Sequence, residues 1–218
     1  PLQSGSDKVL QAMRRSYRRD RYLGIIDKVR SAIPNAAITT DIIVGFPGES
    51  DADFEQTIDL VKQARFSAAY TFQYSKRPGT PAALMPDQIE QDVMADRYNR
   101  LHKIQQDISK LENEKLVGST VELLVSGHEG RHDIDMNRMN GRSADFRLTH
   151  FDNSAKLARS GDLVEVKVEE AFANHIVAGQ PIKVTKTIGA AAHSAWVEDN
   201  GDKKILLGIP TLASLKSL

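Results

Sequence analysis

The chain has 218 residues, 40% of them hydrophobic, and its 29 basic and 29 acidic residues leave a formal net charge of zero at pH 7. This composition is typical of a globular chain of one or two domains, and it excludes a polyanion partner recognised through net charge alone. The chain has no cysteine, so disulfides and thiolate metal ligands within it are excluded. No apolar run approaches the roughly 18 residues of a membrane span, and we expect a cytoplasmic protein with no membrane partner.

The first residues contain signals for a strand end and a helix start. Pro1-Leu2-Gln3 has the pattern of the last residues of a strand, and Ser6 or Asp7 could cap the helix that follows. Because no initiator Met precedes them, we expect the chain to be the carboxyl part of a longer protein. Apolar spacing predicts a short helix around residues 9–13 and a second one that ends near Ala32. The segment between them carries a cluster of arginines, namely Arg14, Arg15, Arg18, Arg19 and Arg21.

The most informative stretch lies between two predicted elements. Residues 37–44 predict a buried strand and residues 52–64 a helix whose cap is Ser50 or Asp51. Gly45, Pro47 and Gly48 break the chain between them. This turn falls at the carboxyl end of the strand, where parallel sheets and barrels hold their ligands. Glycines there expose backbone N–H groups, so the pattern favours a binding site for a polar ligand.

The alternation of strands and helices continues to about residue 118. Residues 68–74 predict a strand and residues 75–81 a loop. A long helix is predicted from Pro86 to near Gly118, and its apolar face consists of Ile89, Val93, Leu101, Ile104, Ile108 and Leu111. Strand–helix alternation is typical of a parallel sheet or a (β/α) barrel.

After Gly118 the period changes to that of short strands. Strands are predicted at residues 121–125, 147–151, 163–168, 175–177 and 182–184. Turns are predicted between them at Asn140-Gly141, at Ser160-Gly161-Asp162 and at Gly179. This spacing indicates a small all-β barrel and a domain boundary near residues 114–118. Beyond residue 188 we expect only an Asn200-Gly201 turn, a strand at residues 203–207 and a weak tail.

The six histidines do not predict a metal site. His128 and His132 are four residues apart, but Gly130 lies between them and makes a helix unlikely to form. No cysteine and no third ligand accompanies this pair. We therefore expect no metal ligand in this chain.

Four motifs in order resemble the radical-SAM methylthiotransferases. They are residues 1–7, residues 13–17 (Met-Arg-Arg-Ser-Tyr), residues 40–49 (Thr-Asp-Ile-Ile-Val-Gly-Phe-Pro-Gly-Glu) and residues 74–82 (Tyr-Ser-Lys-Arg-Pro-Gly-Thr-Pro-Ala). Within the family the chain looks closest to the MiaB-type enzymes, which add a methylthio group to isopentenyladenosine beside the tRNA anticodon. Residues 141–143, 146–147 and 161–166 are similar to a TRAM domain, the RNA-binding barrel of the family.

The resemblance implies a domain layout. Residues 1–115 would form the carboxyl-terminal half of a radical-SAM (β/α) barrel, residues 116–187 the TRAM barrel, and residues 188–218 a tail. The family holds two [4Fe-4S] clusters on cysteines that it places upstream of the region matched here. Because this chain has no cysteine, we expect it to be inactive alone, and no catalytic residue is assigned.

The resemblance also implies two sets of site residues. Those expected at S-adenosylmethionine are Gln3, Ser4, Asp41, Gly45, Pro47, Gly48, Glu49, Tyr74 and Arg77. Those expected at RNA are Arg138, Arg142, Arg147 and Lys156, with Phe146 and Phe151 as stacking rings or core residues. The alternative for each set is structural: a strand-to-helix turn with its cap in the first case, and solvated charges in the second.

Two classes of function follow. In the first, the chain is part of a monomeric methylthiotransferase in which a reduced cluster cleaves S-adenosylmethionine and the substrate is the anticodon stem-loop of tRNA. Within that class, threonylcarbamoyladenosine in tRNA or a ribosomal protein is the alternative substrate. In the second class, the chain is a non-catalytic RNA-binding module.

Overall fold

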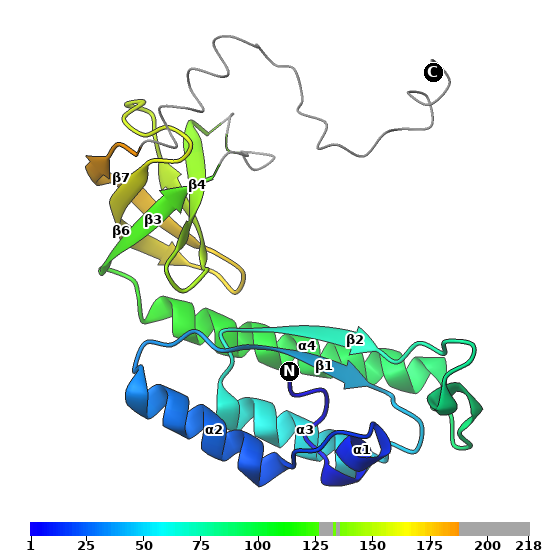
Figure 1. The fold of residues 1–218 in the computed structure, drawn as a ribbon. Helices are drawn as coiled ribbons and strands as arrows, with labels where there is room; N and C mark the ends of the chain where they lie inside the picture. Colours follow the sequence, from blue (N-terminus) through cyan, green and yellow to red (C-terminus); the bar gives the residue numbers. More distant parts are fainter. Residues whose placement is uncertain (127–132, 134–135, 188–218) are drawn as a thin grey trace, which may run out of the picture.

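The computed structural model describes residues 1–126, 133 and 136–187. An α/β unit comes first in the chain and a small β-barrel follows it (Figure 1). The elements of the α/β unit are α1 (Asp7–Ala12), α2 (Arg19–Ala32), β1 (Thr39–Val44), α3 (Asp51–Ala64), β2 (Ala68–Gln73), the 3-10 helix η1 (Pro81–Leu84) and α4 (Gln91–Glu114). The barrel strands are β3 (Thr120–Val125), β4 (Arg138–Ser143), β5 (Leu148–Asp152), β6 (Leu163–Ala171) and β7 (Ile176–Thr185).

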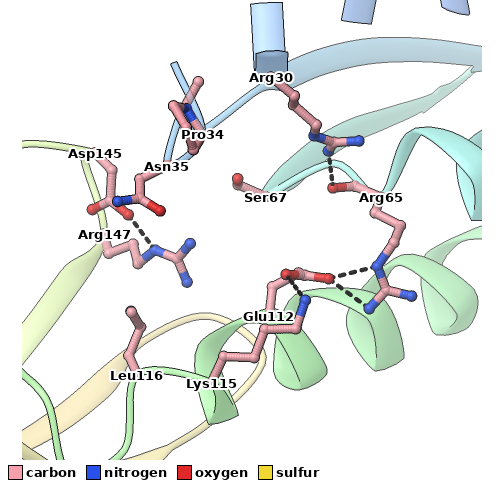
Figure 2. A pocket seen from close by; sticks show the side chains of 11 residues that line it. Arg30, Pro34, Asn35, Arg65, Ser67, Glu112, Lys115, Leu116, Asp145 and Arg147 are labelled. Atoms are coloured by element: carbon pink, nitrogen blue, oxygen red, sulfur yellow. Dashed lines mark hydrogen bonds and ion pairs between the residues drawn. The ribbon is translucent and has the colours of Figure 1, made fainter. Parts of the chain in front are cut away.

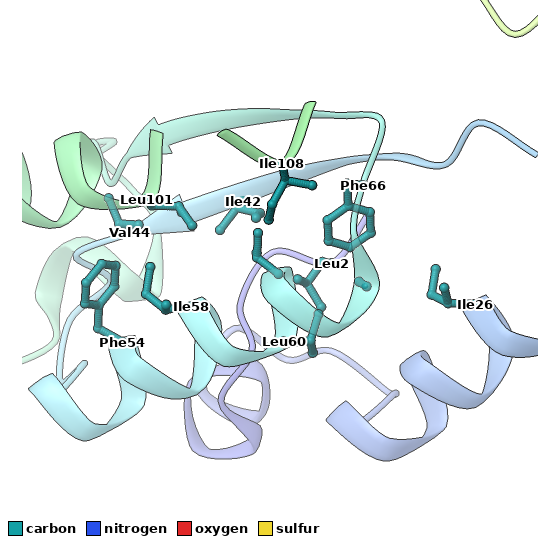
Figure 3. Packing of buried hydrophobic residues seen from close by; sticks show 12 residues of the cluster. Leu2, Ile26, Ile42, Val44, Phe54, Ile58, Leu60, Phe66, Leu101 and Ile108 are labelled. Atoms are coloured by element: carbon teal, nitrogen blue, oxygen red, sulfur yellow. The ribbon is translucent and has the colours of Figure 1, made fainter. Parts of the chain in front are cut away.

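The sheet of the α/β unit is a parallel pair of strands, β1 and β2. Gln3 forms a further parallel bridge with Ile42, so the first residues lie alongside β1 as the sequence analysis expected. The side chains of Thr40, Ile42 and Val44 are buried on the face that the helices cover. Figure 3 shows this core, which includes Leu2, Ile42, Val44, Phe54, Ile58, Leu60, Phe66, Leu101 and Ile108.

The opposite face of the same sheet is open. Tyr70 and Phe72 of β2 are 64% and 52% exposed, and they pair in register with Asp41 and Ile43 of β1. Successive residues of a strand point to opposite faces, so Asp41, Ile43, Tyr70 and Phe72 share the uncovered face.

Helix caps fall where the sequence indicates them. Ser6 is the N-cap of α1 and accepts a hydrogen bond from the Val9 N–H. Ser50 is the N-cap of α3 and forms a capping box with Asp53, a device that contributes about 1 kcal/mol to a helix. The expected inward face of α3 is also confirmed, since Phe54, Ile58 and Val61 are all buried.

Helix α4 differs from its prediction in both bounds and inward face. It begins at Gln91 rather than at Pro86, and it ends at Glu114. Val93 and Leu111, which were predicted to point inward, are exposed. Four polar residues occupy the buried face instead, namely Arg97, Gln105, Ser109 and Asn113. Apolar spacing does not indicate buried polar residues, because their stability depends on partners distant in the sequence.

The second unit is a closed barrel with the strand order β3-β4-β5-β7-β6. All neighbouring pairs are antiparallel except β5 and β7, which are parallel. The interior is filled by alternate residues, as a small barrel requires. They are Leu123, Val125, Phe151, Ala158, Val164, Val166 and Ala178.

Two predicted turns of the barrel are wrong. Asn140-Gly141 lies inside β4, where Gly141 is needed because a Cβ atom would lie 2.6 Å from the Leu124 carbonyl oxygen. Gly179 lies inside β7, so the two strands predicted at residues 175–184 are one. The turn at Gly161 is confirmed, with a φ of 84°. The turn and strand predicted at residues 200–207, together with the tail, lie outside the described residues.

Asn113, in the last turn of α4, connects the two units. Its amide nitrogen donates to the Phe172 carbonyl oxygen at 2.6 Å, and its amide oxygen accepts from Arg147. The barrel is therefore held to α4 through both its β4–β5 turn and its β6–β7 turn. Within the described part of the chain, no helix is both long and apolar enough to cross a membrane.

Candidate functional site

The glycine turn follows the carboxyl end of β1, as predicted. Gly45 and Gly48 have φ values of 76° and 77°, a region that disfavours residues with a Cβ atom. At Gly45 a Cβ atom would also lie 2.2 Å from Cγ of Met94 on α4. Gly48 has open space at that position. The backbone of the turn is thus fixed by glycine conformation at two positions and by close packing at one.

Glu49 points into the protein and closes this turn. Its carboxylate accepts the Gly45 N–H at 2.8 Å and pairs with the Arg97 guanidinium at 2.9 Å. Burial raises the pKa of Glu49, although the Gly45 hydrogen bond and the Arg97 charge act in the opposite direction. The side chain that the sequence analysis placed at the cofactor therefore holds the turn in shape.

Arg97 is a site residue that the sequence analysis missed. Its side chain is 5% exposed, and it donates to the Glu49 carbonyl oxygen at 3.1 Å and to Asp51 at 2.7 Å. It also lies over the Phe54 ring. One signal in the sequence was available, because Arg97 lies four residues before Leu101 on the helical stripe that faces the core. A buried guanidinium needs an acidic partner, and Glu49 supplies one.

Three buried polar atoms at this turn have no hydrogen-bond partner among the described residues. They are Oε1 of Glu49, the hydroxyl of Tyr74 and Nε of Arg97. Tyr74 follows β2, and its ring packs edge-on against Phe46 at 5.4 Å between centroids. The structure thus brings the predicted Tyr74 to the turn. Buried polar atoms without partners are rare and indicate a place for a bound polar group or water.

The other predicted cofactor residues lie next to β1, on it or in the turn that follows it. Gln3 is buried with a φ of 67°, next to Ile42. Ser4 is fully buried, and its hydroxyl contacts Thr57 and accepts the Ser6 N–H. Asp41 is half-buried on the open face of β1. Pro47 is buried within the turn itself.

Arg77 lies past the end of β2, where it is exposed. A cavity of about 620 Å³ lies beside this segment, and its lining includes Tyr74, Ser75, Lys76 and Met94. Met94 is also the residue that contacts Gly45. The glycine turn and this cavity are therefore neighbours.

The four predicted RNA-binding residues do not form one cluster. Arg142 lies opposite Leu148, at the turn between β4 and β5, and Arg147 lies within the same turn. Arg138 lies opposite Asp152 at the other end of the same hairpin, and Lys156 follows that end. Four residues of strand separate the ends, roughly 13 Å. One phosphate group cannot bridge that separation, so a contact with all four residues would need more than one phosphate.

Arg147, which was predicted at RNA, makes contacts within the protein. Its side chain is 18% exposed and pairs with Asp145 at 2.5 Å. It also donates to Asn113 of α4. Arg147 therefore has a structural role between the barrel and the helix. Arg142 is exposed and donates to the Phe146 carbonyl oxygen at 3.0 Å.

The two phenylalanines that were predicted as stacking rings or core have separate roles. Phe151 is fully buried in the barrel, whereas Phe146 is 80% exposed and has a φ of 64°. An exposed ring on a residue in a sparsely populated backbone conformation is energetically unfavourable. Such strained residues concentrate at functional sites. Phe146 therefore stays a candidate for base stacking.

The arginine cluster does not lie on one helix. Residues 14–18 precede α2, which begins at Arg19, and Arg14 has a φ of 57°. Arg19 forms an ion pair with Asp59 of α3, so its charge is engaged within the protein. The exposed members are Arg14, Arg15 and Arg21.

No group of three or more potential metal ligands occurs among the residues that the structure describes. His128 and His132 lie outside those residues.

Comparisons with known proteins match this sequence to a group of enzymes. Residues 1–61, which include the glycine turn, match the model of the Radical SAM superfamily. A tRNA-2-methylthio-N(6)-dimethylallyladenosine synthase 1 from Mycobacterium marinum is 53% identical over 97% of this chain and 40% of its own length. The tRNA-2-methylthio-N(6)-dimethylallyladenosine synthase from Nocardia farcinica is 56% identical over 90% of this chain and 40% of its own length. The synthase of the same name from Rhodococcus jostii is 59% identical over 84% of this chain and 37% of its own length.

Over most of its length the chain is therefore similar to part of the radical-SAM methylthiotransferases. It spans about 40% of the length of the curated relatives that it matches. The resemblance drawn from its motifs is confirmed.

Proposed function

We propose that this chain supplies part of the S-adenosylmethionine pocket and part of the tRNA-binding surface of an enzyme that adds a methylthio group to dimethylallyladenosine in tRNA. The observation that carries the proposal is the glycine turn at residues 45–49, which lies within the Radical SAM match and is locked by Arg97. The names of relatives that are 53–59% identical support the choice of substrate.

The residues at the turn fit S-adenosylmethionine. The glycines leave backbone free of Cβ atoms, and the Tyr74 hydroxyl and the Glu49 Oε1 atom are polar atoms that lack protein partners in the described part of the chain. An adenosine group offers hydrogen-bond donors and acceptors for such atoms. We propose that Gly45, Gly48 and Tyr74 contact the cofactor, with Gln3, Asp41 and Arg77 around it, while Glu49 and Arg97 keep the turn in shape.

S-adenosylmethionine and two [4Fe-4S] clusters would supply the radical and sulfur chemistry when bound. This chain has no cysteine and so offers no thiolate ligand to a cluster. The role left for its own residues is to hold and orient the cofactor and the tRNA. The buried Glu49–Arg97 pair serves that role by hydrogen bonding to the backbone of the turn.

We propose the domain layout that the motifs implied. Residues 1–115 would complete a radical-SAM barrel whose open face carries Tyr70 and Phe72, and residues 116–187 would be a TRAM barrel that binds the anticodon stem-loop. The closed five-strand barrel and the exposed Phe146 and Arg142 support this assignment. Arg138 and Lys156 would contact the same RNA from the far end of the hairpin.

A chimera tests the proposed function. Residues 1–187 would replace the matching segment of the Mycobacterium marinum relative, and the chimera would be expressed in a strain that lacks the methylthio modification. Mass spectrometry of tRNA nucleosides should find the 2-methylthio product. A methylthio group on threonylcarbamoyladenosine or on a ribosomal protein would show a different substrate. A folded, cluster-loaded chimera that makes no methylthio product at all would contradict the proposal and favour a plain RNA-binding module.

A further inference from the structure

A second cavity, remote from the glycine turn, lies where the two units meet. It has a volume of about 540 Å³ and is lined from α2, the end of α3, the end of α4 and the β4–β5 turn of the barrel. Its cationic members are Arg30, Arg65, Lys115 and Arg147, and its carboxylates are Glu112 and Asp145. We call it the basic cavity, because four cations against two carboxylates leave a formal charge of +2.

The cations of the basic cavity keep unused donors. Arg30 uses one nitrogen, Nη2, for the carbonyl oxygens at the end of α3, and its other guanidinium nitrogens have no partner among the described residues. Lys115 makes one contact, with Glu112 at 2.6 Å, and its side chain is 63% exposed. Figure 2 shows the guanidinium groups of Arg30 and Arg147 extending from different elements into the same space.

The two carboxylates of the basic cavity stay charged beside these cations. Burial acts to raise the pKa of Glu112, but hydrogen bonds from Lys115 and Arg65 hold that pKa below its usual value. Asp145 behaves in the same way, because burial opposes its ionisation while hydrogen bonds from Ser143 and Arg147 lower its pKa. Both acids are therefore ionised, and two cationic charges are still uncompensated in the cavity. A phosphate group has the charge and the acceptor oxygens to complete it.

A third cavity adjoins this one and differs in character. It measures about 510 Å³, and it shares Ser67, Asp145 and Arg147 with the basic cavity. Its lining includes the exposed rings of Tyr70 and Phe146 together with Arg142. We call it the aromatic cavity. Cationic grooves beside exposed aromatic rings are the usual arrangement for binding single-stranded nucleic acid, because phosphates and bases alternate along the strand.

We propose that the basic cavity binds a phosphate of the tRNA backbone while neighbouring unpaired bases stack over Phe146 and Tyr70 in the aromatic cavity. The proposal rests on the proposed function for its RNA partner, but it places the contact at the junction of the two units. Arg138 and Lys156, at the other end of the β4–β5 hairpin, would make a contact separate from this one. Since Asn113 and Arg147 fix the barrel to α4, the two cavities keep a constant relative position.

Charge-altering variants on one helix test the phosphate contact. The whole chain would be titrated with an unmodified tRNA transcript by fluorescence anisotropy at several salt concentrations. Lys115→Gln should weaken binding about five- to tenfold at 0.1 M salt and reduce the salt slope by about one. Glu112→Gln removes a carboxylate from the cavity and should strengthen binding.

The same helix offers matched controls. Lys110 and Glu114 form an exposed ion pair on α4, and neither lines the cavity. Lys110→Gln and Glu114→Gln should therefore leave the affinity unchanged within about twofold, since exposed charges away from the contact add little. Phe146→Leu keeps an apolar side chain but removes the ring, and it should weaken binding at least about fivefold.

Two results would overturn the proposal. If tRNA binds and Phe146→Leu weakens it, but Lys115→Gln and Glu112→Gln behave like their controls, the basic cavity is not a phosphate site and the proposed function stands. If the chain does not bind tRNA even at low salt, both the cavity proposal and the tRNA-binding role fail. Lys115 is exposed, so its variant should fold normally even if Glu112→Gln does not.

Discussion

Two glycines of the turn at residues 45–49 share a backbone conformation but differ in their surroundings. Gly45 and Gly48 have φ values of 76° and 77°, yet only Gly45 packs against Met94. This difference separates the cost of a left-handed backbone from the cost of a steric clash.

The first prediction concerns the stability of these positions. Gly48→Ala should reduce the free energy of unfolding by about 1–2 kcal/mol, which is the cost of a left-handed alanine. Gly45→Ala should reduce it by about 2–4 kcal/mol, because the Met94 side chain must also move. Urea unfolding of both variants measures this. Equal losses would mean that the contact with Met94 does not constrain the turn.

Asp53 carries the second prediction, which concerns pH. Burial acts to raise its pKa, but hydrogen bonds from Ser50 and Ser6 and the contact with Lys8 hold the pKa far below its usual value. A group with a lowered pKa stabilises the fold above its unfolded pKa, near 4, and loses that contribution as the pH falls below it. Asp53→Asn should therefore destabilise the protein at pH 7, and the difference from wild type should shrink below pH 4.

Asp59 provides the control for that experiment. It lies on the same helix, and its side chain is 60% exposed. Asp59→Asn should cost much less at pH 7. A stability difference for Asp53→Asn that stays constant from pH 7 to pH 3 would show that its hydrogen bonds do not depend on ionisation.

At the scale of elements, α4 explains why part of the site could not be predicted. Apolar periodicity located the helix, the strands around the glycine turn and the caps at Ser6 and Ser50. It did not indicate Arg97, because the partner that makes its burial possible, Glu49, is 48 residues earlier in the chain. Likewise, Asn140-Gly141 has the local signature of a turn, but the close approach of β3 makes Gly141 part of a strand.

The third prediction concerns the connection between α4 and the barrel. Asn113→Ala should leave Arg147 and the Phe172 carbonyl oxygen without their partner, at a cost of about 1–3 kcal/mol. The barrel should then move more freely about residues 115–119. Limited proteolysis should cleave there sooner than in the wild type. Asn99→Ala, an exposed change on the same helix, is the control, and equal cleavage of both variants would mean that Asn113 does not hold the units together.

At the scale of the whole molecule, the two units have complementary roles. The α/β unit presents a locked turn and an open sheet face, and the barrel presents Phe146 and Arg142 next to a basic cavity. Sequence reasoning located both units and their family. It did not locate the junction, because the cavities there are assembled from elements that are distant in the sequence and that no local motif connects.

The most direct test of this account is a calorimetric titration of S-adenosylmethionine into the cluster-loaded chimera described above. The chimera should bind the cofactor as its Mycobacterium marinum parent does. Gly45→Ala should weaken binding at least tenfold, about 1.4 kcal/mol, because it distorts the turn. Gly118→Ala carries the same left-handed backbone cost with nothing nearby, and it should leave the affinity unchanged. Equal affinities for the chimera and its Gly45→Ala variant would contradict the claim that this turn holds the cofactor.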